Sequence, residues 1–134
     1  MQWAGRNTNP HAIFLVVEGR DFFAARDAEW FPALTGRISA AAVQGYEWVD
    51  QVDFAQRIAA FRQLQQCGFA DAACVDSWSR EHAVQFSHLY VLRHSQSEAT
   101  SPPCCQNLID SLAASGAYEL AFENSDVRIY ERLP

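Results

Sequence analysis

Apolar residues recur along the chain with the two periods that are typical of strands and helices. Residues 12–17 (AIFLVV) form the longest unbroken apolar run and follow Asn9-Pro10. A run without polar alternation is typical of a strand buried on both faces, so we predict a central strand there, in parallel pairing. Shorter runs at 39–44 and 88–93 predict two more strands.

Helical periodicity separates these predicted strands. Residues 50–66 repeat apolar side chains every three or four positions, at Phe54, Ile58, Phe61 and Leu64. We interpret Asp50 and Asp53 as a capping pattern at the start of this helix, and Gly68 as its left-handed stop. The other predicted elements are helices over 27–36 (ending at Gly36), 76–86 and 101–115, a polar loop over 95–100, and strands over 118–123 and 127–130.

The alternation of strands and helices predicts an α/β fold. The predicted order is β-α-β-α-α-β-α-β-β. Repeated βα units favour a three-layer arrangement, with a mostly parallel sheet flanked by helices, and the last two strands predict a C-terminal antiparallel hairpin. The chain has 134 residues and no linker-like tract, so we expect a single domain over 1–134.

The charged residues and the missing motifs narrow the function classes. Ten basic residues, all of them Arg, stand against 16 acidic ones, which gives a net charge of −6. The lack of lysine excludes lysine Schiff bases and the P-loop, and an acidic chain is not expected to bind nucleic acid. Neither G-x-G-x-x-G nor G-x-S-x-G occurs, and the histidines lack metal-ligand spacing. We therefore expect no cofactor, no metal site and no catalytic residue.

Cys67, Cys74, Cys104 and Cys105 are an even set of thiols whose spacing differs from that of zinc motifs. We favour one of two disulfide patterns: Cys67–Cys74 alone, or two bridges that join Cys67 and Cys74 to Cys104 and Cys105. A bond between the adjacent Cys104 and Cys105 is disfavoured, because its small ring fits badly at the start of a helix. Disulfides would indicate an oxidising compartment, and four buried, reduced thiols are the alternative.

Residues 27–48 form the strongest candidate for a binding site. The stretch carries Glu29, Trp30, Arg37, Tyr46, Glu47 and Trp48 around a predicted strand. Ligands in open α/β sheets bind beyond the carboxyl ends of strands, and aromatic side chains among carboxylates and an arginine suit a sugar or a polar partner. In the competing interpretation Trp30, Phe31 and Trp48 are core anchors, because large aromatic side chains usually bury.

Several segments together resemble one group of proteins. They are residues 9–17 (NPHAIFLVV), 29–37 (EWFPALTGR), 43–48 (VQGYEW), 86–91 (FSHLYV), 118–124 (YELAFEN) and 127–130 (VRIY), with Cys67, Cys74, Trp78, Cys104 and Cys105. These segments resemble the C-terminal soluble region of bacterial polytopic membrane proteins. That group is similar to the GT-C class of mannosyltransferase-like glycosyltransferases, which use lipid-linked sugars, and some members are labelled as related to 6-pyruvoyl-tetrahydropterin synthase.

The resemblance implies a non-catalytic accessory domain on the extracytoplasmic side of the bacterial cell membrane, as part of a multi-pass membrane protein. Its expected partner is the transmembrane part of its own chain, and a lipid-linked sugar or an acceptor is a candidate ligand. The catalytic acidic residues of such proteins lie in the transmembrane part, so no catalytic residue is transferred to this chain.

Two other functions follow from the residues alone. The first is a stand-alone cytosolic α/β domain with reduced cysteines, which either binds a polar small molecule or acts as a small enzyme through a cleft near Glu29, Arg37 and Glu47. The second is an interaction module that docks on a partner through exposed Trp30, Phe31 and Trp48. Exposure of those three rings separates the docking interpretation from the core interpretation.

Overall fold

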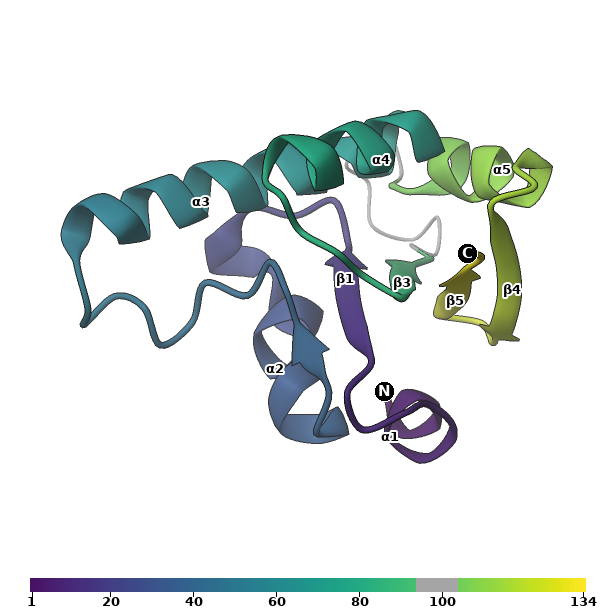
Figure 1. Cartoon of the computed structure of the whole chain (residues 1–134), viewed down its shortest axis with the longest axis horizontal. Coiled ribbons are helices and arrows are strands. Elements are labelled where there is room, and N and C mark those ends of the chain that lie inside the picture. The colour runs from purple at the N-terminus through teal and green to yellow at the C-terminus, as the bar shows by residue number, and fades with distance from the viewer. Residues whose placement is uncertain (94–103) are drawn as a thin grey trace.

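A five-stranded mixed sheet forms the centre of the protein, which the computed structural model describes over residues 1–93 and 104–134 (Figure 1). The strand order is β2-β1-β3-β5-β4. The strands are β1 (Ile13–Val17), β2 (Ile38–Ser39), β3 (His88–Leu92), β4 (Tyr118–Glu123) and β5 (Val127–Arg132). The chain is therefore of the mixed α/β class, as the alternation of elements predicted.

One half of the sheet is parallel and the other is antiparallel. β1 pairs in parallel with β2 and β3, so that Phe14 lies opposite both Ser39 and His88. β5 runs antiparallel to β3 and to β4, and the register between β4 and β5 shifts at a bulge between Leu120 and Phe122. The central parallel strand and the C-terminal hairpin are confirmed. Parallel pairing is limited to three strands, because β5 folds back from β4 and inserts between β4 and β3.

Helices lie against both faces of the sheet. They are α1 (Gln2–Asn7), α2 (Arg26–Thr35), α3 (Gln51–Gln66), α4 (Ala72–Glu81) and α5 (Gln106–Ala114), with 3₁₀ helices at Phe22–Ala24 and Cys67–Phe69. In Figure 1, α3, α4 and α5 run along one side of the sheet, and α1 and α2 lie on the other. Leu15 and Val17 enter the core cluster of α4 and α5, whereas Phe14 and Val16 pack with Phe31 of α2. β1 is thus buried on both faces.

Local sequence signals set several helix ends. The Asp50 carboxylate accepts hydrogen bonds from the backbone N–H groups of Val52 and Asp53, at 2.7 and 3.2 Å, and begins α3 as predicted. Gly36 ends α2 with a left-handed φ of 65°, also as predicted. The prediction for Gly68 is wrong, because this residue lies in the 3₁₀ helix that continues directly from α3.

Other predicted boundaries are corrected by the structure. The strand predicted over 39–44 is limited to β2, because the chain turns where the Ala42 N–H donates to the Ser39 carbonyl at 3.2 Å. The helix predicted over 76–86 is α4, which begins earlier because the Asp71 carboxylate accepts from the Cys74 N–H and caps it. α1 has no counterpart among the predicted elements. The loop predicted over 95–100 and the helix start predicted over 101–103 lie outside the described residues.

All four cysteines are paired, Cys67 with Cys74 and Cys104 with Cys105. The Cys67–Cys74 bond is confirmed, but not as the only bond that its pattern predicted, and the pattern that joins these two cysteines to the adjacent pair is wrong. The Cys104–Cys105 bond also corrects the expectation that adjacent cysteines do not pair. That expectation placed both residues inside a helix, whereas α5 begins after Cys105, whose φ of −137° lies outside the helical range.

Two glycines leave the space that the Cys104–Cys105 disulfide fills. A Cβ atom on Gly68 would lie 2.5 Å from the Sγ of Cys104 and 2.9 Å from the Sγ of Cys105. A Cβ atom on Gly19 would also collide with Cys104, and the φ of 65° at Gly19 favours glycine. Both cysteines are buried in the core cluster that contains Leu108 of α5. The Cys104–Cys105 disulfide is therefore part of the hydrophobic core.

Candidate functional site

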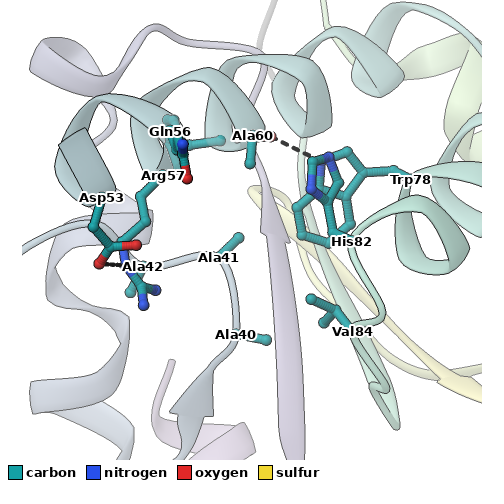
Figure 2. Close-up of a pocket in the computed structure, with 11 residues that line it drawn as sticks. Ala40, Ala41, Ala42, Asp53, Gln56, Arg57, Ala60, Trp78, His82 and Val84 are labelled. Carbon is teal, nitrogen blue, oxygen red and sulfur yellow. Dashed lines mark hydrogen bonds and ion pairs between the residues drawn. The ribbon is translucent and has the colours of Figure 1, made fainter.

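The three alanines that follow β2 form one wall of a pocket. The chain leaves the sheet after Ser39, and the Ala40 N–H still donates to the Phe14 carbonyl at 3.0 Å. Because alanine side chains are short, about 230 Å³ remains open between this segment and helices α3 and α4 (Figure 2). The pocket is lined by Ala40, Ala41, Ala42, Asp53, Gln56, Arg57, Ala60, Phe61, Trp78, His82 and Val84.

One face of α3 supplies the polar wall of the pocket. Asp53, Gln56, Arg57 and Ala60 recur at spacings of three and four, which places them on one side of the helix. The Gln56 side chain is exposed and, among the described residues, no group forms a hydrogen bond with its amide. This face therefore brings an amide, a carboxylate and a guanidinium to the pocket.

The Arg57 side chain is held on two sides. Its Nε donates to the Oδ2 of Asp53 at 2.8 Å, and its Cζ lies 3.7 Å from the ring centroid of Tyr46 in a cation–π contact. Both members of the ion pair are more than a third exposed, so solvent screens the pair and its contribution to stability is small. The two contacts matter because they orient the guanidinium.

Helix α4 forms the opposite end of the pocket. The indole Nε1 of Trp78 donates to the Ala60 carbonyl at 2.8 Å, which fixes the ring against α3. His82, one turn later, has its ring 4.8 Å from that of Trp78, and its Nε2 lies 2.9 Å from the Oε1 of Gln63. An aromatic wall thus stands across the pocket from Arg57 and Asp53 (Figure 2).

The lining side chains suit binding. Within the described part of the chain, no residue that lines the pocket carries the hydroxyl or thiol group of a nucleophile. The polar members can form hydrogen bonds and one ion pair, and the remaining members are apolar. No group of three or more His, Cys, Asp or Glu among residues 1–93 and 104–134 is placed to hold a metal ion.

A second hollow, of about 430 Å³, lies between α1 and β4, and Trp3 and Phe122 line it together with Asn7 and Asn124. Its asparagines are already used by the fold. Asn7 donates to the Trp3 carbonyl at 2.9 Å, and the Oδ1 of Asn124 accepts from the N–H of Val127 at 2.8 Å. Gln2 and Arg6 also line this hollow, and the pocket beside Arg57 differs in that Asp53 and Tyr46 hold its guanidinium in place.

Ligands often bind at the carboxyl ends of strands in α/β sheets. At the carboxyl end of β1, however, the backbone groups already form hydrogen bonds with a side chain of the protein itself. The buried Gln65 side chain accepts from the N–H groups of Glu18 and Gly19 at 2.9 and 3.0 Å. The same amide donates to the Val16 carbonyl at 2.9 Å. One side chain of α3 thereby satisfies the backbone where β1 ends.

Glu18 and Asp27 anchor α2 to the sheet at the same edge. The Glu18 carboxylate accepts from the backbone N–H groups of Asp27 and Ala28, at 3.4 and 3.2 Å. Burial raises the pKa of Glu18, against the lowering effect of the Ala28 hydrogen bond. The Asp27 carboxylate accepts from the Tyr90 hydroxyl at 2.8 Å, and burial together with the charge of Asp27 raises the pKa of Tyr90.

The first two residues of the predicted site lie on α2. Glu29 forms an ion pair with Arg26 at 3.3 Å, and the Trp30 side chain is 52% exposed. Phe31 is fully buried against Phe14. The core interpretation is therefore confirmed for Phe31 and wrong for Trp30.

Arg37 lies just before β2 and binds α1. Its Nη2 donates to the backbone carbonyls of Gly5 and Thr8 at 2.6 and 2.8 Å, and its Nε donates to the Thr8 hydroxyl at 3.0 Å. These contacts join α1 to the connection between α2 and β2. The structure thus gives Arg37 a role in the fold.

The remaining predicted residues, Tyr46, Glu47 and Trp48, lie in the loop before α3. Tyr46 contacts the pocket through Arg57. Glu47 accepts from the Gly45 N–H at 2.7 Å within the loop, and Trp48 is 87% exposed, which contradicts its interpretation as a core anchor. The six residues of the predicted site are spread over α2, the start of β2 and this loop.

Sequence reasoning missed the residues that line the pocket. Asp53 was interpreted as part of a cap, but the capping oxygen belongs to Asp50 and Asp53 pairs with Arg57. The spacing of four between Asp53 and Arg57, and between Trp78 and His82, is the signal that the sequence carries. Such pairs are common on helices, so spacing alone does not distinguish a pocket.

No protein-family model, no curated protein and no solved structure matches this chain. Within residues 1–93 and 104–134, no helix is both long enough and apolar enough to cross a membrane.

Proposed function

We propose that this chain is a binding domain for a small polar molecule, which it holds in the pocket between residues 40–42, α3 and α4. The proposal rests on the open volume beside an oriented Arg57. Ligand sites combine an apolar lining with a few placed polar groups. Here the alanines, Phe61 and Trp78 are apolar, and the polar groups of α3 lie beside them.

The disulfides support placing this binding domain in a non-reducing compartment. Both bonds contribute to the core cluster beside β1, and no free thiol is present. Disulfides persist in secreted, periplasmic or lumenal proteins and are rare where thiols are kept reduced.

The proposal is tested by following backbone amide signals by NMR while small molecules of three classes are added: glucose, glycine and benzoate. At least one class is expected to shift the signals of residues 40–42 and the indole N–H of Trp78. An Ala42→Leu variant fills the pocket and is expected to abolish these shifts. Ala59→Leu, the same change on an exposed position of α3, is the matched control and is expected to keep them. Failure of every class to shift the pocket signals would contradict the proposal.

A second candidate function is the accessory domain of a glycosyltransferase-like membrane protein, with an acceptor or a lipid-linked sugar as ligand. The two disulfides favour the extracytoplasmic setting that this role requires. The native reading frame tests it directly. Several apolar runs of about 20 residues upstream of Trp3 would support the role, and a native start at Met1 would contradict it.

A further inference from the structure

The guanidinium of Arg57 presents an unused edge beside the pocket. Asp53 occupies its Nε, and the Tyr46 ring covers one face. Among the described residues, no acceptor forms a hydrogen bond with either of its terminal Nη atoms. The two Nη groups lie at the end of a side chain that its neighbours already hold in place.

This free edge has the geometry that a carboxylate requires. A guanidinium offers parallel N–H donors at the spacing of the two carboxylate oxygens, and such charge-assisted pairs are stronger than neutral hydrogen bonds. Because Asp53 and Tyr46 orient Arg57 before a ligand arrives, little side-chain freedom is lost on binding. Asp53 also offsets much of the positive charge, which favours a monoanion over a phosphate dianion.

The rest of the pocket limits the body of the ligand. Residues 40–42, Ala60, Phe61, Trp78 and Val84 give it an apolar lining. Its volume of about 230 Å³ lies below the 300–1,000 Å³ that is typical of sites for drug-sized ligands. A single ring or a short branched chain fits this volume, and a nucleotide does not.

We infer that the ligand is a small monocarboxylate with an aromatic or branched aliphatic body, whose carboxylate binds the Nη edge of Arg57 and whose body lies on residues 40–42 and Trp78. The inference rests on the proposed function and names the ligand class for the same pocket. Gln56 also lines the pocket, and its amide can bind a further polar substituent of the ligand.

Matched neutral probes test the charge requirement on the wild-type protein. Benzoate and isovalerate are compared with benzamide and isovaleramide, which have the same bodies without the charge. Each carboxylate is expected to bind at least about tenfold more tightly than its amide, and to shift the signals of residues 40–42 and the Trp78 indole N–H. Equal affinity for acid and amide would overturn the inference.

Variants test the role of the parallel N–H donors of Arg57. Arg57→Lys keeps the positive charge but loses these parallel donors, so benzoate affinity is expected to fall about tenfold. Arg62→Lys is the matched control, because Arg62 lies on the same helix, pairs with Asp21 at 2.8 Å and does not line the pocket. Equal losses in the Arg57 and Arg62 variants would overturn the inference.

The outcomes separate this inference from the function on which it rests. Pocket shifts with glucose or glycine, but not with either carboxylate, would leave the proposed function standing and overturn the ligand class. No pocket shift with any probe would overturn both. Amide signal dispersion equal to that of the wild type shows that each variant is folded.

Discussion

Glu18 is the carboxyl group most fully removed from water in the described structure, with 1% of its surface exposed. Its position at the end of β1 is compensated by two backbone N–H donors at the start of α2. Burial still dominates, and the pKa of Glu18 is raised from its ordinary value of 4.5. The folded protein therefore binds the proton of Glu18 more tightly than the unfolded chain does.

This raised pKa predicts a pH dependence of stability. Between pH 4.5 and the raised pKa the folded state holds more protons than the unfolded state, so the contribution of Glu18 to the free energy of unfolding falls as pH rises through that window. The side chain of the Glu18→Gln variant cannot ionise. The free energy of unfolding of the wild type minus that of the variant is therefore expected to fall as pH rises through the same window. Urea titrations from pH 4 to 8 measure it. Glu119→Gln, at an exposed position, serves as control, and a pH-independent difference for Glu18→Gln would contradict the prediction.

Arg37 allows the sequence interpretation to be tested against the structure. Arg37→Ala removes the hydrogen bonds to Gly5 and Thr8 and is expected to lower the free energy of unfolding by about 2 kcal/mol, without changing ligand affinity. Arg26→Ala removes an exposed ion pair and is expected to change stability by less than about 0.5 kcal/mol. Unchanged stability with lost binding would instead restore Arg37 to the ligand site.

Among the elements, α3 and α4 form the frame of the pocket, and the Cys67–Cys74 bond closes the turn between them. The bond spans a separation of seven residues and lies at the end opposite the Asp50 cap. The Trp78 hydrogen bond to Ala60 is a second link between the two helices. The disulfide and the Trp78 hydrogen bond therefore both hold α4 against α3, the two helices that frame the pocket.

Removal of the Cys67–Cys74 disulfide is expected to lower the stability of the protein. The double variant Cys67→Ala/Cys74→Ala is expected to lower the free energy of unfolding by about 2 kcal/mol, because a bridge restricts the unfolded chain. The midpoint of denaturant unfolding measures the change. Alkylation of the unreduced, unfolded wild type should modify no thiol, and full modification there would contradict the pairing.

The elements that sequence patterns predicted well are those whose ends are decided locally. Asp50 and Gly36 act within one turn of their own helices, and both ends were predicted. β2 is shorter than predicted because a turn at Ala42 takes the chain out of the sheet. The pairing of Cys104 with Cys105 depended on where α5 begins, and that boundary was misplaced.

At the scale of the whole molecule, the candidate site was the part least accessible to sequence reasoning. Its walls come from residues 40–42, α3 and α4, which only the folded chain brings together. The prediction placed the site beyond the carboxyl end of the strand expected over 39–44, but that strand is limited to β2 and the chain turns out of the sheet at Ala42. Glu29, Arg37 and Glu47 have the right chemistry for a site, yet the contacts described above tie each to its own neighbourhood.

The two edge strands of the sheet also affect how copies of the protein associate at high concentration. β2 offers two residues at one border, and β4 at the other is interrupted by its bulge between Leu120 and Phe122. Long, flat borders with unpaired amides are templates on which further chains add as strands. Here the edge strand β2 is too short to serve as such a template. The other edge strand, β4, is distorted by the bulge and carries the exposed carboxylate of Glu119. We therefore expect the bulge that shifts the register of the hairpin also to make this strand a poor template for fibril-like assembly.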